Sequence, residues 1–183
     1  AIAFPIICGL TMPLFNKSAS RKPALAFLIG AQVVETVAVL LMVLSKESST
    51  GLFTMTEDIS VGFTSDGIGK FFSLIVTVGW LLVSIYAAIY MKHETKEPRF
   101  YLFMLLSEGV MIGAALSTNL VSMYVFYEFV TLFSMPLVLH SLSEESIAAA
   151  KKYLFYSVAG AFMALFGIFV LASSADTLDF ISG

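Results

Sequence analysis

Cysteine, histidine and charged residues are scarce in this chain of 183 residues, which contains one cysteine and two histidines. The single cysteine, Cys8, excludes an intramolecular disulfide and a metal site made of several cysteines. The two histidines, His93 and His140, do not form a pair with haem or metal spacing. Glycine-rich nucleotide loops and the HExxH pattern are absent as well. We therefore expect no cofactor and no redox active site within this chain, and no nucleic-acid partner.

Long apolar runs are what the chain has in place of these motifs. Hydrophobic residues make up 58% and charged residues 13% of the sequence, and the mean hydropathy is +0.92. Soluble domains contain about 45–50% apolar and about 25% charged residues. Runs of about 20 apolar residues match the hydrocarbon core of a bilayer when they are helical, and only helices or closed barrels satisfy the backbone there. The composition predicts an all-α, polytopic bundle of transmembrane helices in a lipid bilayer.

Six spans are predicted within a single transmembrane domain, residues 1–183. They cover about residues 1–15, 23–45, 67–91, 100–116, 120–139 and 148–172. Pro23 suits the first turn of the second span, and Asp66 is a good N-cap for the third. The first span is short because the sequence begins inside an apolar run, and we interpret it as a truncated helix.

Residues 52–64 show a different pattern, between the second and third spans. Apolar residues alternate there with polar ones on either side of Glu57 and Asp58. A period of two is typical of strands. We predict a small β-hairpin on the membrane surface, with an irregular amphipathic loop as the alternative.

Basic residues gather in alternate loops. Three loops on one side hold eight of the ten, namely Lys17, Arg21, Lys22, Lys92, Lys96, Arg99, Lys151 and Lys152. The other side has two basic residues beside six acidic ones: Lys46, Lys70, Glu47, Glu57, Asp58, Asp66, Asp176 and Asp179. Cytoplasmic loops carry the excess of lysine and arginine. The pattern predicts that the basic loops face the cytoplasm and that both termini lie outside.

Three glutamates fall near the middle of spans: Glu35, Glu108 and Glu128. An ionised side chain at the bilayer centre costs about 2.5–3.5 kcal/mol or more, and protonating an ordinary glutamate at pH 7 costs about 3.7 kcal/mol. Because the two costs are comparable, such a group can change between charged and neutral, as a proton carrier must. The alternative is a neutral glutamate that only bonds neighbouring helices together.

The three glutamates differ in what surrounds them. Glu35 has only Gln32 as a polar neighbour, which favours a packing role. Glu108 precedes Gly109-x-x-x-Gly113, a close-packing pattern, so packing and ion translocation remain equal alternatives.

Glu128 has the strongest polar surroundings. Tyr124 and Thr131 share its helix face, and Pro136 leaves a carbonyl without its helical donor inside the membrane. His140, at the cytoplasmic end, can titrate near neutral pH, although a terminal histidine is more often an interface residue. We predict that Glu128 acts in ion translocation with Tyr124 and Thr131 beside it.

Two lysines, Lys151 and Lys152, begin the sixth span. Snorkelling to the cytoplasmic surface explains both of them. Lys152 also shares a face with Tyr156 and can point toward the bundle. Either lysine is therefore a candidate partner for Glu128 or a cytoplasmic uptake point for protons. Lys70 is interpreted as an interfacial residue.

Several segments resemble the antiporter-like family of membrane subunits. Residues 99–106 (Arg-Phe-Tyr-Leu-Phe-Met-Leu-Leu), Gly113 and residues 119–128 (Asn-Leu-Val-Ser-Met-Tyr-Val-Phe-Tyr-Glu) resemble its fourth and fifth helices. Residues 146–156 are similar to the start of its sixth helix. The family comprises the proton-pumping subunits of complex I, Mrp-type cation/proton antiporter subunits and the antiporter-like subunits of membrane-bound hydrogenases. Residues 127–140 look most similar to the branch that holds the D-type Mrp subunits and the hydrogenase subunits.

The resemblance implies both a mechanism and an incomplete site. In the family, the counterpart of Glu128 pairs with a lysine on the seventh helix, and changes in this pairing drive ion movement. The lysine-bearing helix and the second inverted repeat lie beyond the six spans of this sequence. The chain is then a fragment of a longer subunit, one part of a split subunit, or a shortened relative.

The function we expect is that of an antiporter-like subunit, or its N-terminal part, in a respiratory or hydrogenase-type complex. Such a complex couples redox chemistry to proton or sodium transport in the cytoplasmic membrane of a prokaryote. Its other membrane subunits would supply the missing lysine, and partner subunits would carry iron–sulfur clusters. The alternatives are a non-pumping structural subunit and a component of a stand-alone Mrp-type antiporter.

Overall fold

The computed structural model describes residues 1–17, 21–56, 59–93, 96–175 and 177–180. Glu57, Asp58 and Asp176, three of the acidic residues assigned to the outer side, lie outside these ranges.

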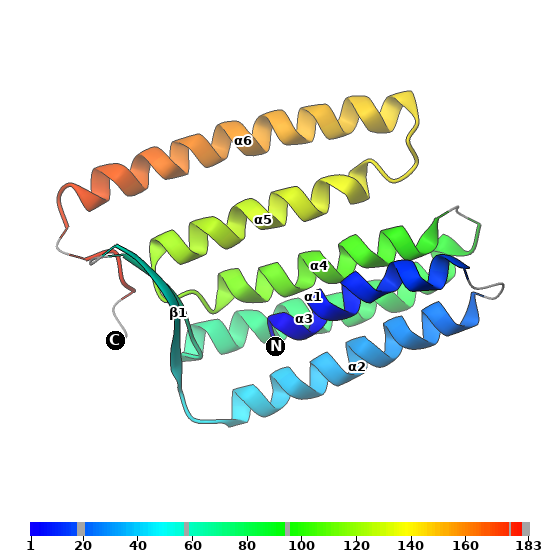
Figure 1. Ribbon diagram of the computed structural model, residues 1–183, viewed down its shortest axis with the longest axis horizontal. Helices are drawn as coiled ribbons and strands as arrows, with labels where there is room; N and C mark the ends of the chain where they lie inside the picture. The colour runs from blue at the N-terminus through cyan, green and yellow to red at the C-terminus, as the bar shows by residue number, and fades with distance from the viewer. Residues whose placement is uncertain (18–20, 57–58, 94–95, 176, 181–183) are drawn as a thin grey trace.

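The described residues form an up-and-down helical bundle with one small antiparallel sheet (Figure 1). The α-helices are α1 (Ala3–Thr11), α2 (Lys22–Leu44), α3 (Gly67–Tyr90), α4 (Glu97–Ala115), α5 (Leu120–Val138) and α6 (Glu144–Ala172). Two 3-10 helices, η1 (Met12–Lys17) and η2 (Met91–His93), extend α1 and α3. The strands are β1 (Ser49–Thr56) and β2 (Ile59–Thr64). The predicted helical bundle with a hairpin between the second and third helices is confirmed.

Local sequence explains where three of the described α-helices begin. Asp66, the predicted N-cap of α3, accepts a hydrogen bond from the Gly69 amide at 2.7 Å. The Asn119 side chain caps α5 in the same way through the Ser122 amide at 2.8 Å. Ser143 caps α6, which therefore begins at Glu144, ahead of the predicted span at 148.

The first predicted span, residues 1–15, is not one α-helix. The α-helical part ends at Thr11, and the chain continues as the 3-10 helix η1. Pro13 lies in this segment and has no amide hydrogen to donate to the preceding turn. The change of helix type thus occurs at Met12, one residue before this proline.

Helix α4 is the centre of the bundle. It packs against α1, α3 and α5, whereas α6 lies at the edge and packs mainly against α5 (Figure 1). Ten residues of α4 are buried, more than in any other described helix. Within the described residues, α2, α3, α5 and α6 are long and apolar enough to cross a membrane, and α1 is a shorter apolar helix. The central position of α4 explains why it tolerates Glu108 and Ser107.

The predicted close-packing pattern on α4 brings two different helices close. A Cβ atom on Gly109 would meet Ile6 of α1, whereas one on Gly113 would meet the Phe126 ring of α5. The two glycines of the pattern therefore do not pack against the same helix. Each glycine allows a different neighbour to approach the central helix.

The β-hairpin lies across the bundle end that holds the turn between α4 and α5. The Thr64 amide donates to the Leu116 carbonyl at 2.7 Å, and the Thr118 amide donates to the Gly62 carbonyl at 3.1 Å. The first strand begins at Ser49, three residues before the predicted start at Leu52. The alternation in the sequence therefore identified the hairpin correctly, and its position on a membrane surface stays a prediction.

The opposite bundle end collects the basic loops (Figure 1). Arg21 forms an ion pair with Glu97 at 2.5 Å and donates to the Ala88 carbonyl at 2.6 Å. The Tyr101 hydroxyl donates to the same carboxylate at 3.1 Å. The hydrogen bond with Glu97 raises the pKa of the Arg21 guanidinium, so this group stays cationic. The network fixes the ends of α3 and α4 to the start of α2.

Candidate functional site

Glu128 lies in the middle of α5 and is half-buried. Its Oε1 atom is buried and has no hydrogen-bond partner among the described residues. Tyr124, one turn earlier, interacts electrostatically with this carboxyl group. Thr131, three residues later, is buried. The three side chains therefore form a polar stripe on an otherwise apolar helix, with one carboxyl oxygen open to a further partner.

Among the described residues, neither candidate lysine forms an ion pair with Glu128. Lys151 and Lys152 are exposed at the start of α6. A hydrogen bond between the Ser134 and Tyr153 hydroxyls, 2.7 Å long, shows that these two residues lie opposite each other on the antiparallel helices α5 and α6. In this register the lysines lie about 10–12 Å from Glu128 along the helix axis, at about 1.5 Å per residue.

His140 joins the end of α5 to the start of α4. Its carbonyl accepts a hydrogen bond from Arg99 at 2.7 Å, and its ring meets Phe100 edge-on with centroids 5.4 Å apart. Twelve residues separate it from Glu128, which corresponds to about 18 Å of helix. A direct proton transfer between the two side chains is excluded by that separation.

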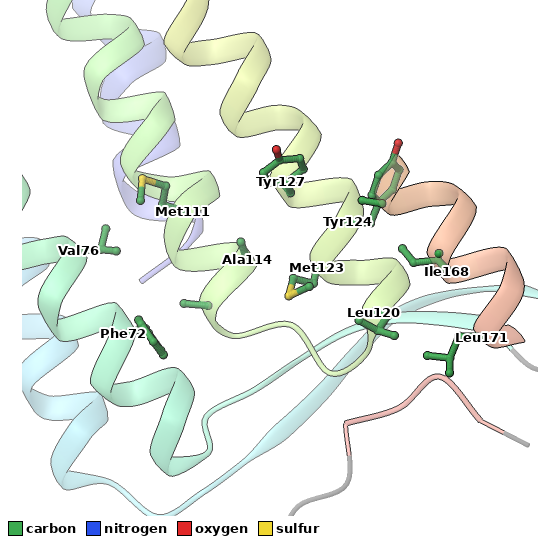
Figure 2. A pocket seen from close by; sticks show the side chains of 13 residues that line it. Phe72, Val76, Met111, Ala114, Leu120, Met123, Tyr124, Tyr127, Ile168 and Leu171 are labelled. Carbon is green, nitrogen blue, oxygen red and sulfur yellow. The ribbon is translucent and has the colours of Figure 1, made fainter. Parts of the chain in front are cut away.

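An apolar cavity of about 610 Å³ opens beside the stripe, between α3, α4, α5 and α6. Figure 2 shows Phe72 and Met111 on one side and Ile168 on the other, with Tyr124 and Tyr127 projecting from α5. Tyr124 thus contributes to the cavity wall and also interacts with Glu128. The polar stripe therefore adjoins a space with an almost entirely apolar lining.

Glu108, the fourth-helix candidate, belongs to a different polar cluster. The Gln32 Nε2 atom donates to Glu108 Oε2 at 2.5 Å. Glu35 lies one helical turn from Gln32 and interacts electrostatically with Glu108. The structure thus brings Glu35 and Glu108 together between α2 and α4. We describe Gln32, Glu35 and Glu108 as the carboxyl–amide cluster.

A buried polar face of α3 lies between α2 and α4. Ser73, Thr77 and Ser84 are each 0% exposed and share one face of the helix. Lys70, on the same face, is buried apart from 9% of its surface and donates to the Ser45 carbonyl at 2.7 Å. Its interfacial position, which the sequence suggested, stays a prediction. The spacing of these four residues was the signal that could have identified the face.

Two family models match this chain, on either side of the α4 region. The model described as "NADH-Ubiquinone oxidoreductase (complex I), chain 5 N-terminus" matches residues 53–101. The model described as "NADH:quinone oxidoreductase/Mrp antiporter, TM" matches residues 117–182. Both matches support an antiporter-like membrane subunit of the complex I and Mrp type. With its apolar helices, this antiporter-like chain is a multi-pass membrane protein.

Related sequences agree with this assignment. The chain is 29% identical to the Na(+)/H(+) antiporter subunit A1 of Staphylococcus haemolyticus (strain JCSC1435), over 98% of its own length and 23% of that protein. It is also 29% identical to subunit A1 of Staphylococcus aureus, over 94% of its length and 22% of that protein. This antiporter-like chain thus spans about a quarter of these relatives. Both relatives are A1 subunits, whereas residues 127–140 suggested the branch with the D-type Mrp subunits.

Solved structures share the fold. A chain of the archaeal membrane-bound sulfane sulfur reductase superposes with a TM-score of 0.77 at 18% identity, covering 97% of this chain and 37% of that one. A chain of the Mrp complex from Dietzia sp. DQ12-45-1b superposes with a TM-score of 0.79 at 21% identity, covering 97% and 20%. The helical arrangement of this antiporter-like chain is therefore one that solved membrane complexes also contain.

Proposed function

We propose that this chain is the N-terminal helical part of an antiporter-like subunit that moves protons or sodium ions across a prokaryotic cytoplasmic membrane. One observation carries the proposal: Glu128 has a buried oxygen without a hydrogen-bond partner among the described residues, in the middle of α5. It lies in the region matched by the complex I and Mrp antiporter family model. A carboxyl group in that position can take up and release a cation as its surroundings change.

A cationic partner for Glu128 comes from outside the described helices in this proposal. The exposure of Lys151 and Lys152 at the start of α6 supports a partner from elsewhere. A lysine-bearing helix from a further segment or from another membrane subunit would approach the open oxygen of Glu128. Approach of its ammonium group would favour the charged carboxylate, and withdrawal would favour proton uptake.

Tyr124 and Thr131 position the carboxyl group in this scheme. Both lie on the face of α5 that carries Glu128, and Thr131 is buried. Their hydroxyl groups can hydrogen-bond to the carboxylate or to water beside it. They would hold Glu128 in one orientation while its partner approaches and withdraws.

The test is the substitution Glu128→Gln in the complete complex that contains this chain. Translocation is followed in everted membrane vesicles with a pH-sensitive dye, before and after addition of sodium. We expect loss of translocation with normal assembly, because an amide cannot exchange a proton in this way. The exposed Glu47, changed to Gln, is the matched control and should retain full activity. Undiminished translocation by the Glu128 variant would refute the proposal.

The subunit could belong to a stand-alone antiporter or to a redox-driven complex, and its partner subunits distinguish the two. The named relatives are Na(+)/H(+) antiporter subunits, which supports a stand-alone antiporter. The similar fold in a respiratory membrane complex supports a redox-driven one. In the redox-driven setting, partner subunits carry the iron–sulfur clusters and this chain handles only ions. Purification of the intact assembly, with spectroscopy for iron–sulfur clusters, separates the two.

The orientation we propose places the basic bundle end in the cytoplasm and the β-hairpin and both termini on the outer side. The support is the excess of lysine and arginine at one end. Cys8 is buried, so single cysteines can be introduced at exposed sites without replacing it. A membrane-impermeant maleimide should label Lys152→Cys only from the cytoplasmic side and Ser49→Cys only from outside. The opposite labelling would reverse the orientation.

A further inference from the structure

The carboxyl–amide cluster is fully buried inside the bundle. Gln32 and Glu108 are 0% exposed and Glu35 is 1% exposed. Gln32 and Glu35 come from α2, and Glu108 comes from the central helix α4. One hydrogen bond, from Gln32 Nε2 to Glu108 Oε2, ties the two helices together at this depth.

Four oxygen atoms of the cluster have no hydrogen-bond partner among the described residues. They are Gln32 Oε1, Glu108 Oε1 and both carboxyl oxygens of Glu35. The Gln32 amide directs Nε2 at Glu108, so its Oε1, on the same carbon, remains an acceptor within the cluster. Ionised carboxylates also only accept hydrogen bonds. With both carboxyls ionised, the cluster would therefore hold four buried acceptors, with the second N–H of Gln32 Nε2 as the donor left in the cluster.

Among the described residues, no lysine or arginine forms an ion pair with Glu35 or Glu108. The ion pair between Arg21 and Glu97 lies at the basic bundle end. Lys70 of α3 is committed to the Ser45 carbonyl at the hairpin end. Protonation of the carboxyl groups would therefore remove their negative charge and provide O–H donors for the buried oxygens of the cluster.

Titratable and polar groups face the cluster from each neighbouring helix. On the α1 side, Cys8 interacts electrostatically with both glutamates. The α3 face contributes the neutral hydroxyls of Ser73, Thr77 and Ser84 in addition to Lys70. On α5, across the central helix, Tyr124, Tyr127 and Glu128 make no described hydrogen bond to the cluster.

We propose that Gln32, Glu35 and Glu108 form a buried proton-binding site, separate from Glu128, in which two carboxyls share an exchangeable proton. One carboxyl stays protonated and donates its O–H to an acceptor of the cluster. The other releases its proton to water and becomes a carboxylate, which accepts from Gln32 Nε2 and from the remaining O–H. Uptake of a proton from water restores the neutral pair. Two neighbouring carboxylates would repel each other, so the site does not lose both protons together.

In this proposal Glu35 takes part in proton binding, whereas the sequence favoured a packing role for it. A structural role alone would need only a neutral, permanently protonated side chain. The second carboxyl group and the Gln32 amide can both donate hydrogen bonds to a carboxylate and so stabilise it. A purely structural role does not need that stabilisation. The site rests on its own contacts and does not require that Glu128 be the translocating residue.

Infrared spectroscopy of the full protein in lipid bilayers tests the proposal directly. The carbonyl band of protonated carboxylic acids is recorded over a pH series for the wild type, Glu35→Gln and Glu108→Gln. We expect an acid band at neutral pH that loses intensity at alkaline pH, as one of the two carboxyls ionises, and that shifts in heavy water. Each single variant should lose this titrating band, whereas the exposed control Glu47→Gln should keep it.

The other results contradict the proposal. A wild-type spectrum without an exchangeable, titrating acid band overturns it without any variant. A band that persists in both Glu35→Gln and Glu108→Gln places the proton elsewhere. A band that is lost in the variants but neither titrates nor exchanges in the wild type indicates a purely structural hydrogen bond. None of these results depends on the translocation assay of Glu128→Gln.

Gln32→Leu provides a second, spectroscopic signature. The variant removes the N–H donor that reaches Glu108. The acid carbonyl band should move to higher frequency, because a carbonyl group that loses a hydrogen bond becomes stiffer. Circular dichroism of the same samples confirms that the helices remain intact. An unchanged band position would refute the assigned role of Gln32.

Discussion

Replacing Gly109 by alanine tests the packing that holds Glu108 in the centre of the bundle. A Cβ atom at this position would lie 2.5 Å from Cγ1 of Ile6 and 2.8 Å from the carbonyl oxygen of Ile2. Non-bonded carbon atoms are most stable about 3.5–4.0 Å apart. The Ile6 side chain can rotate away, but the Ile2 oxygen belongs to the backbone. Helix α1 must therefore move away from α4.

The expected cost follows from two opposing effects. Overpacking of a well-packed core costs about 1–3 kcal/mol. Alanine is more favourable than glycine inside a helix by about 0.8–1.0 kcal/mol. The net destabilisation of Gly109→Ala is then about 0–2 kcal/mol. Gly30 of α2 is the matched control, since no atom lies within 4 Å of its added Cβ. Gly30→Ala should be stabilised by the higher helix propensity of alanine without any overpacking. The free energies of unfolding of the two variants should therefore differ by about 1–3 kcal/mol.

Reversible unfolding in mixed micelles measures this difference. Trp80 is the only tryptophan of the chain, and its indole N–H donates to the Met104 carbonyl at 2.8 Å. Its fluorescence therefore reports the separation of α3 from α4. Equal stabilities of Gly109→Ala and Gly30→Ala would show that α1 does not pack closely on α4, and the argument from the glycine would be wrong.

Three further substitutions test other contacts. Ser143→Ala removes the N-cap of α6 and should destabilise its first turn by about 1 kcal/mol, seen as faster hydrogen exchange there. Trp80→Phe removes the indole hydrogen bond and should lower stability by about 1 kcal/mol, measured by thermal circular dichroism; no loss would contradict the α3–α4 contact. In a double-mutant cycle, Arg21→Gln and Glu97→Gln should show a coupling of about 0.5–1 kcal/mol; additive effects would mean that the ion pair contributes nothing.

The sequence alone predicted the helices and the hairpin because these depend on local patterns. Apolar runs long enough for a bilayer, interrupted by polar loops, separate one helix from the next. Asp66 marked the start of α3 through its cap. The period of two before it identified the strands. The hydrogen bonds from the hairpin to Leu116 and Thr118 were not predictable, because they join segments far apart in the sequence.

The candidate site was predicted in part. Glu128, Tyr124 and Thr131 share a face of α5 by spacing alone, and one helix is enough to specify that relation. The distance from Glu128 to Lys151 and Lys152 could not be known before the register of α5 and α6 was available. A side-chain contact between Ser134 and Tyr153 shows that register.

Only the tertiary structure brought Glu35 and Glu108 together. Gln32 and Glu108 are 76 residues apart in the chain, and a sequence does not state which helices become neighbours. Apolar periodicity gives little help in a membrane, because the face toward lipid is as apolar as the face toward the core. The residue types determined by themselves that six helices form and that they carry buried carboxyls. The rotation and pairing of those helices decided which carboxyls meet.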